Sequence, residues 1–183
     1  MTGTGMAPNA PGMTRPDSSE HAPYYGKYIA LVPDGDIVAT LEAQRSETAR
    51  FLAGLSEQQA AHRYAPDKWS VKEVVGHVAD SERIFAYRAL RISRGDQMPI
   101  EGFEQDDYVR AAQFDRLSIA DLAAEFTSVR QATLRLFANL SPDAWTRRGV
   151  ANKNEVSVRA LAYMIAGHEL HHRQILREKY GAG

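Results

Sequence analysis

Apolar residues recur at intervals of three and four along four long stretches of this chain, a pattern typical of amphipathic helices. We expect these helices at residues 34–55, 70–93, 118–140 and 157–180. The last three begin at Ser70, Ser118 and Ser157, and serine is a preferred residue at helix N-termini. Short helices are predicted after Ser56 and Ser141. No stretch carries a convincing strand pattern, so the sequence predicts an all-α fold.

The chain consists of two similarly organised halves. Each half reads as a long helix, a short helix after a Leu-Ser pair, a loop, and a serine-capped long helix that carries Gly-His. These pairs are Gly76-His77 and Gly167-His168. The repeat predicts two helical hairpins related by a pseudo-two-fold, packed as a four-helix bundle in which the histidine-bearing helices face each other.

The segments between and before these helices differ in composition. Residues 1–20 are rich in Gly, Pro, Ser and Thr, so we expect a flexible tail there and place the bundle domain at residues 21–183. Residues 21–33 are expected to lie over the bundle as an extended segment, and residues 147–154 to form a polar loop. The connection at residues 95–116 is too long for a tight turn. We expect it to contain a short helix, and such long connections are often functional.

Composition and charge exclude several classes of function. The 183 residues have a net charge of −1, from 22 basic and 23 acidic residues, which gives no electrostatic footprint for nucleic acid. The chain has no cysteine, which excludes disulfides, thiolate ligands and a cysteine nucleophile and suits a reducing cytoplasm. No apolar run approaches the ~20 residues of a membrane span, and the N-terminus lacks a signal-peptide pattern. We therefore expect a cytoplasmic protein with neither nucleic acid nor membrane as partner.

Two histidines occupy one face of the last predicted helix. His168 and His172 fall on a seam whose other members are mostly apolar: Val158, Leu161, Ile165 and Ile175. A four-residue step turns a helix by about 40° and rises about 6 Å, so both imidazoles can reach one ion. The alternative is two core histidines hydrogen-bonded to neighbours. A pair on one seam favours the metal.

His77 lies beside the apolar seam of the second long helix and is the third candidate ligand. The polar residues that share its face form a stripe: Glu73, Asp80, Ser81 and Arg88. Such a stripe is either a solvated edge or the lining of a wet internal pocket. Glu73 has an alternative role, because Ser70 and Glu73 match a capping box.

The segment from His168 to His172 also satisfies H-E-x-x-H, the signature of zinc proteases. These enzymes need a third ligand, usually well downstream, and only eleven residues follow His172. A protease cleft also needs an edge strand to pair with the peptide, and no strand is predicted. We therefore interpret the match as coincidental.

Together, the segments Trp69–Arg83 and Ala166–His172 resemble the DinB-like (YfiT-like) family of metal-dependent enzymes, over roughly residues 34–180. The resemblance implies an up-down four-helix bundle, a three-histidine site for zinc or nickel, and frequent homodimers. Carried over to the matching positions, the ligands are His77, His168 and His172. Members of the family include S-transferases that use low-molecular-weight thiols such as bacillithiol or mycothiol, and a thiol-dependent maleylpyruvate isomerase.

Three imidazoles leave an open coordination position, which is the pattern of a catalytic metal site. Nitrogen and oxygen ligands suit zinc, nickel or iron(II) without choosing among them, and such a metal activates water or a thiol. As catalytic residues we consider Asp80, one turn from His77, and Glu169, although Glu169 points about 100° away from the ligand direction of His168. His171 lies about 100° from His172, so we expect it, with Glu73 and Arg88, around the pocket rather than on the ion.

These observations favour a metal-dependent S-transferase or hydrolase that acts on a small molecule, with water or a low-molecular-weight thiol at the ion. The alternative is a metal-binding stress-response module without turnover. An accessible fourth position beside a concave pocket would favour the enzyme, whereas a sealed core would favour the module. A third hypothesis is a scaffold in which the histidines only pack and hydrogen-bond.

Overall fold

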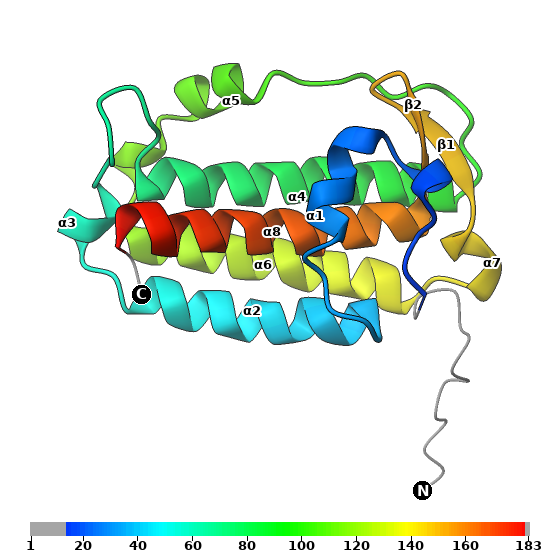
Figure 1. Ribbon diagram of the computed structural model, residues 1–183, viewed down its shortest axis with the longest axis horizontal. Coiled ribbons are helices and arrows are strands. Elements are labelled where there is room, and N and C mark those ends of the chain that lie inside the picture. Colours follow the sequence, from blue (N-terminus) through cyan, green and yellow to red (C-terminus); the bar gives the residue numbers. More distant parts are fainter. Residues whose placement is uncertain (1–13, 182–183) are drawn as a thin grey trace, which may run out of the picture.

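A computed structural model describes residues 14–181, and within them four long helices lie side by side (Figure 1). They are α2 (Ile37–Ala53), α4 (Val71–Ser93), α6 (Ile119–Ala138) and α8 (Val158–Tyr180). The predicted short helices are also present, as α3 (Glu57–Ala60) and α7 (Pro142–Trp145). The all-α four-helix bundle is therefore confirmed. No helix in the described part of the chain is both long and apolar enough to cross a membrane.

Side-chain caps fix where the long helices begin. The Asp36 carboxylate accepts a hydrogen bond from the Val38 amide (2.8 Å), so the first long helix begins at Ile37, three residues later than expected at Asp34. Ser70 and Glu73 form the predicted capping box. Each cap satisfies amide groups that have no partner within the helix, typically contributing about 1 kcal/mol.

The long helices do not simply alternate in direction along the chain. In Figure 1, α2 and α8 run in one direction, whereas α4 and α6 run in the other. Packing joins α4 to α8, α4 to α6 and α2 to α6, so consecutive helices α2 and α4 lie across a diagonal, as do α6 and α8. A 180° rotation about an axis between α4 and α8 exchanges the halves, which agrees with the expected pseudo-two-fold. The order is therefore up-down-down-up rather than the strict alternation expected.

The long connection between α4 and α6 makes this order possible. It returns along α4 and carries α5 (Gln105–Ala112), the short helix predicted there (Figure 1). After α5, the Asp115 carboxylate accepts a hydrogen bond from Ser70 Oγ (2.5 Å), which brings the start of α6 beside the start of α4. The crossing segment thereby covers one flank of α4.

Residues 147–154, predicted as a polar loop, form most of a β-hairpin instead. β1 (Arg148–Ala151) pairs antiparallel with β2 (Asn154–Ser157). The two turn residues, Asn152 and Lys153, both have positive φ, 49° and 64°, which is the backbone of a two-residue hairpin turn. Ile100 in the long connection pairs with β1. Its amide donates a hydrogen bond to the Val150 carbonyl (2.9 Å), and its carbonyl accepts one from the Asn152 amide (2.8 Å). The hairpin thus anchors the long connection over the bundle.

The N-terminal segment packs on the bundle, contrary to the expected tail at residues 1–20. A short 3-10 helix spans Ser18–Glu20, and Glu20 is buried, accepting hydrogen bonds from Ser157 Oγ (2.7 Å) and Arg159 Nε (3.1 Å). The segment expected to be extended is largely helical, with a 3-10 turn at Pro23–Tyr25 and α1 at Gly26–Ile29. Residues 1–13 of the expected tail lie outside the described residues.

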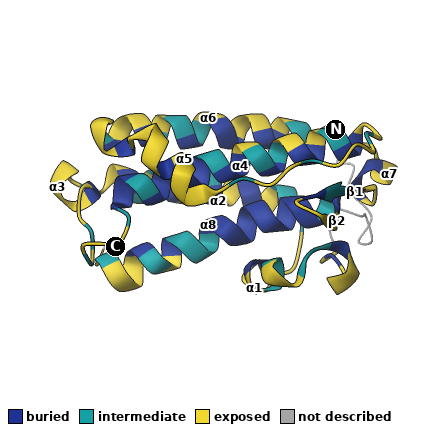
Figure 2. Ribbon diagram, turned by 90° about the horizontal axis from the view of Figure 1, so that it is seen from above, coloured by how far each residue is buried: buried dark blue, intermediate teal, exposed yellow. Residues whose placement is uncertain are grey.

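The N-terminal half of the fourth long helix is almost entirely buried. Figure 2 shows α8 buried along its N-terminal half, whereas α5 is largely exposed. One side of α8 contributes to an apolar core with α2 and α4, and α1 covers another side. Because α8 is enclosed in this way, polar side chains on it need partners within the protein.

Candidate metal centre

Three histidine side chains from two helices converge where α4 packs against α8. His77 comes from α4, and His168 and His172 lie one turn apart on α8. The His168 Nε2 atom is 3.1 Å from Nε2 of His77 and 3.1 Å from Nε2 of His172. The three candidate ligand atoms all lie within 4.8 Å of one another.

The two separations of 3.1 Å are close to those expected between nitrogens that share a divalent metal ion. Zinc sits about 2.0–2.1 Å from imidazole nitrogens, so nitrogens that share a tetrahedral ion lie roughly 3.3 Å apart. Among residues 14–181, no other His, Cys, Asp or Glu joins the cluster. A three-nitrogen donor set leaves one coordination position open, as catalytic sites require.

Burial keeps the three imidazoles neutral. Desolvation lowers the pKa of His77 to about 4 and, together with the neighbouring histidines, that of His172 to about 3. The pKa of His168 is lowered for the same reasons. At neutral pH the rings therefore carry no proton that would compete with a metal for their lone pairs.

Neighbouring side chains orient the rings. Ser81 Oγ lies 3.5 Å from His77 Nδ1, where it can accept a hydrogen bond from Nδ1–H and leave Nε2 free for a metal. The ring centres of Trp69 and His77 lie 4.8 Å apart, and the rings of Tyr28 and His168 pack edge to face with their centres 5.5 Å apart. These contacts hold the nitrogens in place from several directions.

In each Gly-His pair, the glycine lies where another part of the chain comes very close to the helix. A Cβ atom at Gly76 would lie 2.4 Å from the Phe114 ring, and one at Gly167 would lie 2.0 Å from the Tyr28 carbonyl oxygen. Glycine therefore lets Phe114 pack against α4 and lets α1 pack against α8. The repeat seen in the sequence reflects two such contacts, each directly before a ligand candidate.

A pocket of about 260 Å³ opens beside the histidines. Its lining includes His77 and His168, aromatic residues from the N-terminal segment, and polar residues from α4, the long connection and the hairpin turn: Tyr24, Tyr25, Tyr28, Ser81, Phe85, Arg88, Phe103, Glu104, Gln105, Asp106 and Asn152. A second depression of about 330 Å³ touches His172 and Trp69. Gln105 and Asp106 of α5 line both hollows, so α5 lies across the entrance to the cluster.

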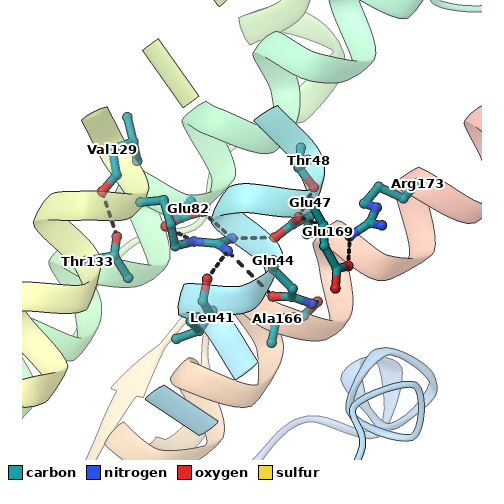
Figure 3. A network of polar contacts seen from close by, with 11 residues as sticks. Leu41, Gln44, Glu47, Thr48, Glu82, Val129, Thr133, Ala166, Glu169 and Arg173 are labelled. Carbon is teal, nitrogen blue, oxygen red and sulfur yellow. Dashed lines mark hydrogen bonds and ion pairs between the residues drawn. The ribbon is translucent and has the colours of Figure 1, made fainter. Parts of the chain in front are cut away.

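The structure does not place the two predicted catalytic carboxylates in this site. Asp80 pairs with Arg83 (3.2 Å) and does not line the pocket. Glu169 is 1% exposed, and its carboxylate pairs with Arg130 (2.6 Å) of α6 within a buried polar network (Figure 3). Neither carboxylate therefore reaches the pocket beside His77 and His168, because neighbouring positions on a helix point in directions about 100° apart, and a catalytic role for either stays a prediction.

The other three residues predicted around the pocket have different surroundings in the structure. Glu73 closes the cap of α4 and pairs with Arg63 (2.5 Å), so it belongs to the helix terminus. His171 lies beside Tyr28, with ring centres 5.0 Å apart, and does not join the histidine cluster. Arg88 does line the pocket.

Several pocket residues were not among the candidate site residues. Ser81 was on the polar stripe of α4, one position from the favoured Asp80. Asp106 lies in the long connection whose length indicated a functional segment. No sequence pattern indicated Asn152 as a pocket residue, because its position depends on a hairpin that was not predicted.

Comparisons with known proteins agree with this fold. A family model for the DinB superfamily matches residues 40–176, and the chain belongs to that superfamily. The chain is 23% identical over 135 residues to a protein of Oceanobacillus iheyensis named "Putative metal-dependent hydrolase OB0413", covering 72% of this chain and 76% of that one.

Two solved structures share the fold. YfiT from Bacillus subtilis, described as a probable metal-dependent hydrolase with an unusual four-helix bundle topology, matches with a TM-score of 0.71 at 16% identity, over 94% of this chain and 96% of that one. The mycothiol-dependent maleylpyruvate isomerase matches with a TM-score of 0.66 at 14% identity, over 84% of this chain and 63% of that one. At these identities the likeness concerns the fold.

Proposed function

We propose that this protein is a metal-dependent hydrolase of small molecules, with His77, His168 and His172 as the ligands of one divalent ion. The observation that carries this proposal is the convergence of three buried, neutral imidazoles on one point beside an open pocket. When bound, zinc or nickel supplies Lewis acidity, which activates a nucleophile at neutral pH. A sealed metal-binding module would not need the adjoining pocket, and this favours the enzyme over the module.

Other residues around the pocket have separate roles in the proposed reaction. Ser81 holds the His77 ring in the tautomer that exposes Nε2. Asp106 is exposed on α5 and borders both hollows beside the cluster, so we propose it as the proton acceptor in place of Asp80 and Glu169. The tyrosines of the N-terminal segment close the pocket on the side of α8. Burial and the neighbouring Tyr24 raise the pKa of Tyr28, so this phenol stays protonated and can donate a hydrogen bond to a substrate.

A second candidate is transfer of a low-molecular-weight thiol, with the thiol in place of water as nucleophile. The fold likeness to an isomerase that depends on mycothiol favours this reading. Because the chain itself has no cysteine, the sulfur would have to come from a free thiol. We further propose a cytoplasmic location and a homodimer, in line with the implied family properties.

The proposal is tested by screening zinc- and nickel-loaded protein against panels of small esters and amides, with and without added thiols. We expect turnover that is lost in His168→Ala and reduced at least about tenfold in Asp106→Asn. Turnover only in the presence of a thiol would assign the transferase. A hydrolytic rate that survives in His168→Ala would contradict the proposal.

A further inference from the structure

The pocket contains a buried arginine that lacks an acidic partner. Arg88 is 3% exposed and lines the pocket three turns along α4 from His77. Its Nη2 donates to the Glu101 carbonyl (3.0 Å), while its Nε has no hydrogen-bond partner within residues 14–181. No carboxylate in that range forms an ion pair with it. Burying a cation without a neighbouring anion costs free energy, so we expect an anion to bind beside Arg88.

The same bundle shows how a structural arginine is satisfied. Arg130 is fully buried, and its guanidinium pairs with Glu82 (2.8 Å) and Glu169 (2.6 Å) (Figure 3). Both carboxylates come from neighbouring helices, so this group is complete without a ligand. Arg88 is also buried, at 3% exposed, but has no such partners. The difference indicates that the anion for Arg88 comes from outside the chain.

The surroundings of Arg88 indicate where that anion would lie. The Phe85 ring is 5.8 Å from the guanidinium carbon and 6.0 Å from the ring of His168. Tyr25 also packs on Phe85, with ring centres 5.9 Å apart. Arg88 and the histidine cluster are therefore the two polar ends of one pocket, and an apolar ring lies between them.

The charges of the pocket restrict the anion further. Besides the histidines, its charged lining consists of buried Arg88 and the exposed Glu104 and Asp106. One buried positive charge beside two exposed negative charges suits a ligand with a single negative charge turned inward. A dianion such as a phosphate monoester would leave a charge unpaired and face the two carboxylates.

We propose that the substrate is a small monocarboxylate whose carboxylate binds Arg88, whose apolar spacer lies over Phe85, and whose reacting group lies at the histidine cluster. This inference rests on the proposed function, because the histidines are taken as the reacting end. Arg88 is then the residue that selects the substrate and sets its direction in the pocket. Its guanidinium can bind a carboxylate through two parallel hydrogen bonds.

The test compares two probes of the same shape, hexanoate and hexanamide, by NMR titration of nitrogen-15-labelled protein. We expect wild type to bind hexanoate at least about tenfold more tightly than hexanamide, as a charge-assisted hydrogen bond implies. Arg88→Gln should remove this preference and Arg88→Lys should keep part of it. Arg83→Gln, on the same helix but outside the pocket, is the matched control and should behave as wild type. The spectra themselves show whether each variant is folded.

Each titration is repeated with zinc-loaded and metal-free protein, which separates this inference from the proposed function. A preference in the metal-free wild type that disappears in Arg88→Gln supports the inference, even if the protein takes up no metal and the proposed function fails. A preference that survives in Arg88→Gln, or that wild type never shows, overturns it. In particular, a preference that needs zinc and ignores Arg88 would place the carboxylate on the ion.

Discussion

His168 and Glu169 are adjacent in the chain, yet their side chains point into different parts of the bundle. The His168 ring faces His77 across the helix contact, whereas the Glu169 carboxylate lies 2.6 Å from Arg130 within a buried polar network (Figure 3). Thr48 also donates to this carboxylate. The two residues thus separate the functions of α8, one facing the candidate metal centre and the other tying α8 to α2 and α6.

The buried network predicts that Glu169 acts on stability rather than on metal binding. Glu169→Gln should lower the free energy of unfolding by about 3 kcal/mol, because it removes one of two carboxylates from a buried arginine. Metal content in the folded fraction should not change. Glu47→Gln, which alters an exposed partner of Arg173, is the control and should cost less than about 1 kcal/mol. Denaturant unfolding with metal analysis measures both effects. A folded Glu169→Gln protein that binds no metal would place Glu169 in the site.

Ser81 is predicted to tune metal affinity through His77. Ser81→Ala removes the oxygen next to His77 Nδ1, so the affinity for zinc should fall by roughly tenfold. Asp80→Asn, the neighbouring change on the outer side of α4, should leave affinity unchanged. Competition with a chromophoric chelator gives both dissociation constants. Equal affinities for wild type and Ser81→Ala would contradict this role of Ser81, and a loss of affinity only in Asp80→Asn would assign the role to Asp80 instead.

The N-terminal segment is predicted to contribute to stability. Glu20 is 4% exposed and accepts hydrogen bonds from Ser157 and Arg159, so Glu20→Gln should lower the free energy of unfolding by about 2 kcal/mol. Its hydrogen bonds to these residues lower the pKa of Glu20 despite the opposing effect of burial. The loss should therefore be full near neutral pH and should shrink as the pH falls through the carboxyl range. Glu155→Gln on the exposed side of β2 is the control, and equal melting temperatures for the two variants would contradict this role.

The metal-free protein should lose stability as the pH falls below about 6.5. The folded pKa of His77 is about 4, below its ordinary value of 6.5, so between these values the unfolded chain binds more protons than the folded one. For His77 alone the loss reaches roughly 3 kcal/mol at the lower end of this range. Chemical unfolding of wild type and His77→Gln across pH 4 to 7.5, both without metal, isolates this contribution. Parallel pH profiles for the two proteins would show that His77 is not buried as a neutral ring.

Much of the helical framework could be predicted because its signals are local. Ser70, Ser118 and Ser157 each lie at the start of a helix, and the His168–His172 spacing places both rings on one face of α8. The path of the chain between the helices, in contrast, has no local signal in the sequence. The connection from α4 to α6 is long enough to lead to either end of the bundle, so its length did not determine the direction of α6.

The residues that the sequence could not place have a common physical cause. Asp80 and Ser81 both lie one turn from His77, and the crossing of α4 and α8 decides which of them meets the histidine ring. Glu169 could not be placed without Arg130, which lies 39 residues earlier on another helix. The hairpin was missed because its strands have four residues each and carry polar side chains. In each case the deciding contact lies far away in the sequence.

The central claim, a three-histidine metal centre, is tested most directly by measuring metal content in purified protein. Elemental analysis of protein prepared without chelator should find about one zinc or nickel per chain in wild type and in His171→Ala. His77→Ala, His168→Ala and His172→Ala should each lose it. His171→Ala is the matched control, because His171 lies beside the cluster and outside it. Full metal content in any of the three ligand variants, or no uptake by wild type after incubation with zinc or nickel, would contradict the account.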